Sequence, residues 1–366
     1  MLKFTITKEA FLEGLQKVQS VVSSRATLPI LSNVLIEAST GQLRLTTTDL
    51  DVGVSGVVEA EVATEGATTL PVRRLASIIR ELPAESVEIE VNADNVASIR
   101  SGPSFFKIIG LASREFPDLP KFEEAKTYLV PMSMLWDGLR KTSYAISTDE
   151  TRYVLNGIFF SVKEGKLTLV ATDGRRLAMV ENEFEVSADN EAEFIVPTKG
   201  VAELQRLLQS EGEVTLKLSD SQIRFEIGDS VVVSKLIEGN YPNYRQVIPG
   251  EPNQSLMIGR DALLDTVKRV ALLSSDKSNS VKLSFSEGEL GVSANTPDVG
   301  EAKETMPVAF TAEPFAIAFN PDFLQAPLKT LSVDEIQLDL INEMAPGVLR
   351  SGGNFLYVLM PMRVTG

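Results

Sequence analysis

The sequence lacks the residues that most often carry out covalent chemistry in proteins. It contains no cysteine and no histidine, which removes thiolate nucleophiles, disulfides, Cys/His metal sites and the imidazole base of most serine hydrolases. An enzyme would need a carboxylate base or a lysine nucleophile instead. Asp49 and Asp173 stand at equivalent turns, but their third counterpart is Thr296, and no Gly-rich phosphate loop accompanies them. We therefore expect no catalysis, no cofactor and no metal.

A second kind of chemistry is electrostatic and comes from Lys and Arg on predicted helices. The predicted helical segments carry thirteen basic and eight acidic residues, whereas the whole chain has a net charge of −15. The segments are 8–24, 72–82, 133–148, 198–209, 260–274 and 321–331. Because the apolar stripe of each helix must pack on a sheet, their basic side chains are expected to face solvent. Ten of the thirteen are singled out as candidates for this solvent-facing set: Lys17, Arg73, Arg74, Arg80, Arg140, Lys141, Lys199, Arg206, Lys268 and Arg269.

Two interpretations of these basic helices are open. Helices often carry Lys and Arg on a solvated face without further meaning. Alternatively, the helices form a basic lining on an acidic body, suited to a polyanion that is held through its phosphates without sequence readout. The acidic remainder would weaken adventitious contacts, so affinity for a duplex would have to come from enclosing it.

The elements that position these residues occur in three copies. Residues 3–24, 127–148 and 255–274 each read as a short alternating strand followed by an amphipathic helix. A strand, a Gly-x-Leu turn and a second strand follow in each copy, with the glycines at 41, 165 and 288. A second helix then begins near a proline at 71, 197 or 321, and alternating strands close the copy.

The spacing of about 124 residues between copies is too long for a solenoid, so each copy is a whole domain. Polar, proline-containing stretches at 120–124 and 249–253 read as linkers. We therefore expect domains at 1–125, 126–252 and 253–366. Each is predicted to be α+β, with strands in antiparallel hairpins and two helices that share one face.

Composition and patterning restrict the remaining classes. The chain has 43% hydrophobic and 23% charged residues, which is typical of a globular protein long enough to bury its own cores. No apolar run approaches the ~18 residues of a membrane span, so we expect a cytoplasmic protein without membrane contact. Open sheets in tandem domains leave edge strands that must be paired or otherwise protected from pairing with other chains. Edge-to-edge pairing gives a curved array, which a head-to-tail interface between chains could close into a ring.

Several segments together resemble the bacterial DNA polymerase III beta subunit, the replicative sliding clamp, over essentially the full length. The segments that carry the resemblance are RATLPILSN at 25–33, RYVLNG at 152–157, ATDGRRLA at 171–178, YPNYR at 241–245 and YVLMPMR at 357–363. The resemblance implies a homodimeric ring of six like modules, with helices inside and sheets outside. Such a ring encircles duplex DNA and tethers the replicative polymerase without performing chemistry, and an ATP-driven clamp loader opens it.

The resemblance also assigns roles to residues of this chain. A groove for short partner motifs that end in apolar residues would use Leu155, Thr172, Gly174, Arg175, Arg176, Leu177, Pro242, Val247, Val358, Met360, Pro361 and Met362. A second part of this groove would use Arg152, Asn320, Phe323, Met344 and Pro346. Methionine and proline suit an adaptable apolar groove of this kind.

DNA contacts are expected from the resemblance at Arg25 and at the loop that carries Arg152 and Tyr153. The full expected DNA-binding set adds the helix residues Arg73, Arg74, Arg140, Lys141, Lys199, Arg206, Lys268 and Arg269. For the interface between protomers, the resemblance points to Ile78, Leu82, Phe106 and Ile108 meeting Leu272 and Leu273.

Two features depart from the family pattern. Gln246 stands where many relatives carry a basic residue beside the groove. Pro327 interrupts the last predicted helix, where a kink would reshape the groove wall near Phe323. The alternative function that stays open is a repeat scaffold built from the same domains but without affinity for DNA.

Overall fold

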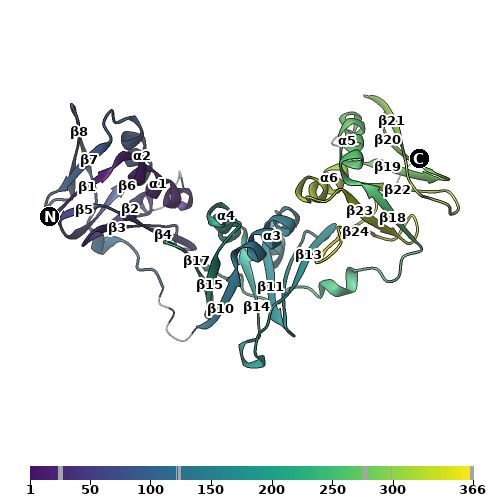
Figure 1. The fold of residues 1–366 in the computed structure, drawn as a ribbon, viewed down its shortest axis with the longest axis horizontal. Helices are drawn as coiled ribbons and strands as arrows, with labels where there is room; N and C mark the ends of the chain where they lie inside the picture. The colour runs from purple at the N-terminus through teal and green to yellow at the C-terminus, as the bar shows by residue number, and fades with distance from the viewer. Residues whose placement is uncertain (24–27, 121, 123–124, 275–278, 298, 363–366) are drawn as a thin grey trace. The chain divides into compact units, whose positions relative to one another are not determined.

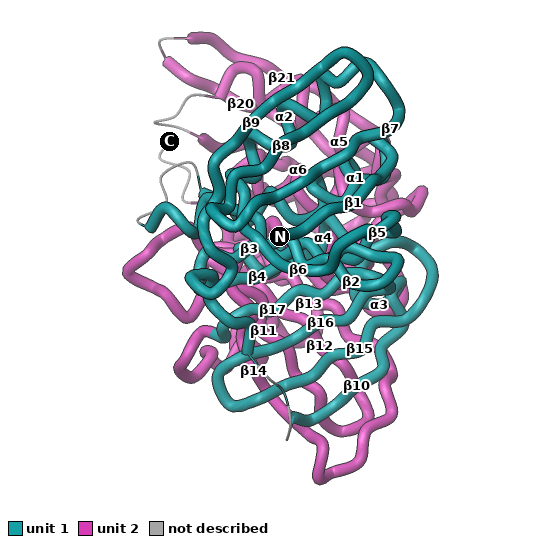
Figure 2. Tube along the Cα trace, turned by 90° about the vertical axis from the view of Figure 1, so that its left-hand side faces the viewer, with its two compact units in different colours: residues 1–136, 199–236 teal, residues 137–198, 237–366 magenta. Residues whose placement is uncertain are grey.

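The structure is a computed structural model, and it describes residues 1–23, 28–120, 122, 125–274, 279–297 and 299–362. Its residues separate into two compact units, Met1–Trp136 with Lys199–Leu236 and Asp137–Thr198 with Ile237–Gly366 (Figure 2). Two sheets belong to each unit, and all strand pairs are antiparallel. Six helices accompany these sheets in the described part of the chain (Figure 1). The predicted α+β class is confirmed.

The first unit contains a five-stranded and an eight-stranded sheet. The smaller sheet has the order β5 (Glu61–Thr64), β1 (Leu2–Thr7), β7 (Ser86–Val91), β8 (Val96–Ser101) and β9 (Ser104–Ile109). The larger sheet has the order β10 (Lys126–Pro131), β15 (Glu213–Leu218), β16 (Gln222–Ile227), β17 (Ser230–Lys235), β4 (Val52–Glu59), β3 (Gln42–Thr48), β2 (Asn33–Ser39) and β6 (Gly66–Pro71).

The second unit repeats this plan with an eight-stranded and a four-stranded sheet. The larger sheet has the order β14 (Ala192–Pro197), β11 (Gly157–Lys163), β12 (Lys166–Thr172), β13 (Arg176–Glu183), β25 (Phe355–Leu359), β24 (Gly347–Arg350), β23 (Glu335–Leu340) and β18 (Gln254–Gly259). The smaller sheet has the order β21 (Gly300–Pro307), β20 (Glu289–Thr296), β19 (Val281–Ser286) and β22 (Phe315–Phe319).

Each eight-stranded sheet joins strands of two neighbouring sequence copies. The junction in the first unit is β17 with β4, where Val232 pairs with Val54. In the second unit it is β13 with β25, where Leu177 pairs with Val358. Edge-to-edge pairing of neighbouring copies, expected because open edges must be covered, is therefore observed at both junctions. The middle copy contributes four strands to each large sheet, which explains why it is divided between the two compact units.

The six helices lie where the hydrophobic period predicts them. They are α1 (Lys8–Val18), α2 (Val72–Glu81), α3 (Met132–Thr142), α4 (Thr198–Leu207), α5 (Arg260–Val270) and α6 (Pro321–Thr330). Short 3₁₀ turns extend three of them: η1 (Gln19–Val21), η4 (Ser143–Ala145) and η8 (Ala271–Leu273). The remaining 3₁₀ turns are η2 (Pro29–Ser32), η3 (Ser113–Glu115), η5 (Glu150–Leu155), η6 (Ala188–Asn190) and η7 (Tyr244–Val247).

The apolar stripe of each helix is buried as its spacing predicts. Phe11, Leu15 and Val18 of α1 have no exposed surface, and α1 packs on β3 and β4 beside α2. A side chain at Gly14 would put its Cβ 2.6 Å from Cγ1 of Val58, so this helix approaches the sheet too closely for any larger residue. The same arrangement recurs where α5 packs on β20 and β21 beside α6.

The repeated Gly-x-Leu motif forms a two-residue hairpin in all three copies. Ser39 pairs with Gln42, Lys163 with Lys166 and Ser286 with Glu289. The intervening glycines, at 41, 165 and 288, have φ of 78°, 72° and 71°. Because this left-handed conformation is strained for a residue with a Cβ atom, glycine is favoured at the same place in each copy.

Candidate functional site

A tight turn follows β12 and carries the Asp173-Gly174-Arg175-Arg176 motif. The Thr172 hydroxyl accepts a hydrogen bond from the Gly174 amide at 3.1 Å and donates to the Arg176 carbonyl at 2.6 Å. Oδ1 of Asp173 accepts from the amides of Arg175 and Arg176 at 2.9 and 3.1 Å. Gly174 has φ 84°, and its position is crowded as well, because a Cβ there would lie 2.8 Å from Nη1 of Arg152.

The first copy builds the same turn, which explains why two aspartates recur at equivalent places. Oδ1 of Asp49 accepts from the amides of Asp51 and Val52 at 3.0 and 2.8 Å. Thr48 makes the same pair of bonds as Thr172, since its hydroxyl accepts from the Leu50 amide and donates to the Val52 carbonyl, both at 3.0 Å. The two carboxylates therefore organise backbone turns and are not free to act as general bases.

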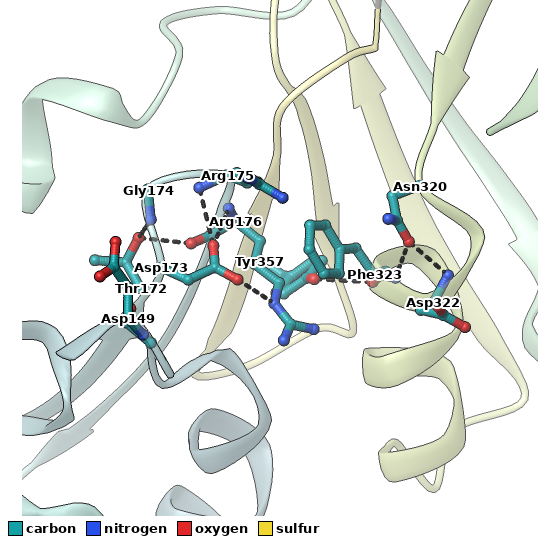
Figure 3. Close-up of polar contacts among 11 residues, drawn as sticks. Asp149, Thr172, Asp173, Gly174, Arg175, Arg176, Asn320, Asp322, Phe323 and Tyr357 are labelled. Atoms are coloured by element: carbon teal, nitrogen blue, oxygen red, sulfur yellow. Dashed lines mark hydrogen bonds and ion pairs between the residues drawn. The ribbon is translucent and has the colours of Figure 1, made fainter. Parts of the chain in front are cut away.

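Arg176 is held between an acid and aromatic rings (Figure 3). Its Nε donates to Oδ2 of Asp173 at 3.1 Å, and its side chain is only 13% exposed. The guanidinium carbon lies 4.2 Å from the centre of the Phe323 ring and 6.0 Å from that of Tyr144. A buried, paired guanidinium on an aromatic face is fixed in position, so Arg176 ties the turn after β12 to helix α6.

A cavity of about 300 Å³ opens beside this cluster. Its lining comes from the segment after α3, from η5, from the turn after β12 and from α6. The lining residues are Ile146, Ser147, Thr148, Asp149, Arg152, Asp173, Arg175, Arg176 and Phe323. Four of the expected groove residues are thus brought together in one cavity, and the mixture of three arginines, two aspartates and an aromatic ring can hold both polar and apolar parts of a ligand.

An apolar floor lies on one face of the second eight-stranded sheet. The buried cluster contains Phe159, Val170, Leu177, Ile195, Tyr244, Val348, Leu356 and Val358. Leu177 and Val358 are both 2% exposed, and Leu155 is 7% exposed. The segment after β17 covers this floor, because Tyr241 stacks on Phe159 with 4.8 Å between ring centres. These three expected groove residues are therefore buried in the chain itself.

Several apolar residues of the expected groove are exposed and lie outside the cavity lining. Val247 is 48% exposed, Met360 is 43% exposed and Met362 is 36% exposed, and Pro242 is also exposed. The amide of Met360 donates to the Arg175 carbonyl at 2.9 Å, and that of Met362 to the Ala318 carbonyl at 2.7 Å. The segment 360–362, with Pro361 half-buried, is thus fixed at both ends although β25 stops at Leu359.

Three further groove candidates have other placements. Asn320 caps α6, since its Oδ1 accepts from the amides of Asp322 and Phe323 at 2.9 and 3.2 Å. Met344 is 75% exposed in the turn before β24, and Pro346 is half-buried in the same turn. Neither of the last two lines the cavity that contains Phe323.

Two exposed basic residues on α4 have partners within the first unit. Nζ of Lys199 donates to Oδ2 of Asp49 at 2.7 Å. Arg206 pairs with Glu203 at 2.6 Å and also donates to the carbonyls of Gln16 and Lys17 at the end of α1. A cation at a helix C-terminus satisfies carbonyls that lack an intrahelical partner. Arg206 is exposed as expected, but it is bound to Glu203 and to the end of α1.

Most other expected DNA-binding cations have a local partner. Lys141 is only 15% exposed because it pairs with Asp137 one helical turn earlier at 2.6 Å, so it does not face solvent as expected. The remaining pairs join Arg73 to the Val22 carbonyl, Arg140 to Ser332 and Asp137, Arg152 to Asp149, Lys268 to Asp265 and Arg269 to Glu304.

Arg74 is exposed and has no hydrogen bond or ion pair with any described residue. Tyr153 is 57% exposed, and Arg25 lies outside the described residues.

The Asp49–Lys199 pair gives a pH-dependent prediction. Burial raises the pKa of Asp49, but the hydrogen bonds from Lys199, Val52 and Asp51 outweigh it and hold the pKa below its ordinary value. Its charge therefore adds stability above the ordinary carboxyl pKa, and this stability is lost as pH falls through the lowered value. We expect Asp49→Asn to reduce the free energy of unfolding by about 1 kcal/mol at pH 7, and by progressively less below about pH 4.

Urea unfolding at pH 7 and at pH 3.5 tests this prediction. Asp51→Asn is the matched control, because the Asp51–Lys235 pair is more than half exposed on both sides and is expected to contribute little. A loss from Asp49→Asn that is the same at both pH values would contradict the assignment of the effect to its charge.

The expected interface residues lie on β9, in and just after α2, and in η8. Strand β9 ends the five-stranded sheet and β21 ends the four-stranded one. Phe106 on β9 is 39% exposed and Leu272 after α5 is 77% exposed, whereas Leu82 and Ile108 are only 2% and 6% exposed. Ile78 and Leu273 are half-buried. Leu82 and Ile108 are thus already buried within the chain itself.

The cavity lining includes residues that the sequence did not indicate, among them Asp149, which caps η5 by accepting from the Thr151 amide at 3.0 Å. Tyr144 and Tyr357 do not line the cavity. Tyr144 lies beside the Arg176 guanidinium, and Tyr357 lies beside Tyr144. Tyr144 gives no sequence signal, since an aromatic residue after a helix is typical of an ordinary core.

Among the described residues, no cluster of three or more carboxylates could hold a metal ion. None of the described helices is long and apolar enough to cross a membrane.

The sequence matches all three domains of the DNA polymerase III beta-subunit family. The N-terminal domain matches over residues 2–120, the central domain over 130–243 and the C-terminal domain over 245–363. A curated relative, the beta sliding clamp of Chlamydia muridarum, is 36% identical over 363 residues and covers 99% of each chain.

Solved structures of similar proteins have the same fold. The sliding clamp of Bartonella birtlesii, crystallised with griselimycin, superposes with a TM-score of 0.94 at 38% identity, covering 99% of this chain and 100% of the other. The sliding clamp of Pseudomonas aeruginosa, also with griselimycin bound, gives a TM-score of 0.95 at 34% identity over 99% and 100% of the two chains.

Proposed function

The chain belongs to the DNA polymerase III beta-subunit family, the bacterial sliding clamps, and from this premise we propose how its own residues hold DNA and partners. A sliding clamp is a non-catalytic subunit, which agrees with the absence of cysteine and histidine and with the use of Asp49 and Asp173 as turn organisers. No observation favours the alternative of a scaffold without affinity for DNA.

We propose that two protomers form a closed ring around duplex DNA, with the six helices of each protomer inside. Duplex DNA carries one charge per ~1.7 Å of its axis, so basic groups on the helices meet phosphates wherever the duplex lies. The contact carries no sequence information and permits sliding. Arg73, Arg74, Lys268 and Arg269 are exposed, and we assign them the largest share of this contact. Lys199 also keeps an exposed charge beside Asp49. Arg206 contributes less directly, because it is bound to Glu203 and to the end of α1.

We propose that the replicative polymerase and other partners bind through the groove made by the cavity at Phe323, the exposed side chain of Val247 and the segment 360–362. The single observation that carries this assignment is the joining of Arg152, Arg175, Arg176 and Phe323 in one cavity. Griselimycin, present in the structures of two relatives, is expected to bind the same groove of this chain and serves as a probe for it.

The assembly has three further proposed parts. The edge of β9 with Phe106 meets the η8 turn with Leu272, which lies beside β21, on a second protomer. This contact would cover exposed apolar groups. A clamp loader opens this interface with ATP. The sequence copies 1–125, 126–252 and 253–366 act as the three domains of each protomer, in the cytoplasm where the chromosome is replicated.

Retention on circular DNA tests the proposed function. The clamp is loaded onto a nicked plasmid with the clamp loader of a relative, and bound clamp is measured by gel filtration. We expect it to remain bound until a restriction enzyme linearises the plasmid and then to slide off, because enclosure and not contact strength holds it. A bound fraction that does not depend on closure of the circle would support the scaffold alternative.

A further inference from the structure

Helix α6 contains a proline in its interior without ending there. The helix runs from Pro321 to Thr330, and Pro327 is buried within it. Proline has no amide hydrogen, and its ring crowds the carbonyl four residues earlier. The carbonyl of Phe323 therefore loses the hydrogen bond that an ordinary residue at position 327 would donate.

The side chain of Tyr357 supplies the missing donor. Its hydroxyl donates to the Phe323 carbonyl at 2.8 Å (Figure 3). Tyr357 has no exposed surface, and burial raises the pKa of its hydroxyl although the Arg176 guanidinium opposes this shift. The hydroxyl thus stays protonated and able to donate at physiological pH. A buried carbonyl without such a donor would be costly, so the bond links β25 to α6.

Phe323, whose carbonyl accepts a hydrogen bond from the Tyr357 hydroxyl, also forms part of the cavity wall. The Phe323 ring lines it and lies against the Arg176 guanidinium, with 4.2 Å from the guanidinium carbon to the ring centre. Tyr357 itself does not line the cavity. Its neighbour Val358 faces the other side of the sheet and belongs to the apolar floor. One strand therefore sets both the floor and, through Tyr357, the position of the wall.

We propose that Tyr357 is a positioning residue of the partner groove, whose hydroxyl replaces the amide that Pro327 removes and so fixes Phe323 at the cavity wall. This inference rests on the proposed function of the groove. The hydrogen bond from Tyr357 explains why Pro327 is compatible with an ordered cavity wall at Phe323. It also makes the two positions interdependent, since an amide at position 327 would satisfy the same Phe323 carbonyl that the Tyr357 hydroxyl now satisfies.

The test compares wild type with Tyr357→Phe, Pro327→Ala and the double variant. Binding of griselimycin is measured by isothermal titration calorimetry. We expect Tyr357→Phe to weaken binding about fivefold, which is the scale of one lost hydrogen bond. Pro327→Ala is expected to bind like wild type. The double variant is expected to regain wild-type affinity, because the new amide of residue 327 donates to the Phe323 carbonyl.

Tyr144→Phe is the matched control. Tyr144 is also a buried tyrosine beside Arg176, but its hydroxyl has no hydrogen-bond partner among the described residues. Its removal is therefore expected to leave griselimycin affinity unchanged. If Tyr357→Phe binds like wild type, or if the double variant stays as weak as Tyr357→Phe, the positioning role is overturned. A fall in melting temperature alone, without a change in affinity, also overturns it.

A second readout separates this inference from the proposed function. With 4-fluorophenylalanine at position 323, the ¹⁹F resonance of the ring reports its order without any ligand. We expect one sharp signal in wild type, a broadened or doubled signal in Tyr357→Phe, and a single sharp signal again in the double variant. If wild type does not bind griselimycin, the groove assignment fails, and the ¹⁹F spectra still decide whether Tyr357 positions Phe323.

Discussion

Removing residues 360–366 is expected to lower the affinity for griselimycin at least about 100-fold. Met360 and Met362 are among the few large apolar side chains of the proposed groove that remain exposed. Burying such a side chain against a ligand contributes about 1.5–3 kcal/mol, so the loss of two corresponds to a factor of about 100 or more. The truncation also removes the backbone bonds from Met360 to Arg175 and from Met362 to Ala318, which hold the segment at the groove.

Calorimetry with griselimycin measures this loss, and analytical ultracentrifugation measures the association of protomers. A control that lacks only residues 364–366 is expected to bind like wild type, because it keeps both methionines. Protomer association is expected to be unchanged in both truncations, since the proposed interface uses β9 and the η8 turn. Affinity of the longer truncation within threefold of wild type would show that the groove lies elsewhere.

The sequence predicts most of the fold because three copies repeat the same local signals. A glycine at each hairpin and an apolar stripe on each first helix recur at the same spacing, so each copy supports the interpretation of the others. Asp49 and Asp173 are also explained by the repeat, as both organise the same turn. The other two copies resolve assignments that are ambiguous in one copy, such as the assignment of a short alternating segment to a strand.

The candidate site is less predictable because its key contacts are far apart in the sequence. The resemblance places Arg176 in the groove, but no local pattern shows that it packs against Phe323, about 147 positions further along the chain. Pro327 predicts a disturbed helix, and only the fold brings Tyr357 to the affected carbonyl. Likewise Arg206 reads as a solvent-facing cation, but the pairing of neighbouring copies places it at the end of α1. Local patterns carry no information about such partners.

Reversing the charge of the exposed helix cations that have the weakest partners among the described residues is expected to shorten primer-extension products about tenfold. The variant combines Arg74→Glu, Arg80→Glu and Lys268→Glu. All three residues are exposed, and Arg74 and Arg80 make no hydrogen bond or ion pair with any described residue. Lys268 has only an exposed pair with Asp265 at 3.3 Å. Their charge is therefore available to phosphates, unlike that of Arg206, whose charge is used within the first unit.

The matched control reverses three strand residues, Arg44→Glu, Lys163→Glu and Lys282→Glu, and so changes the net charge by the same amount. Exposed charges more than ~10 Å apart are largely screened at 0.1 M salt. If the helices face the duplex, the interaction with DNA therefore depends on where the reversed charges lie and not on the net charge of the chain. The control is then expected to extend primers like wild type. The helix variant is also expected to show a shallower dependence of DNA retention on salt, since each phosphate contact contributes about 0.9 to the logarithmic slope. Equal effects of the two triple variants would mean that net charge alone controls the interaction and that the helices do not line the duplex.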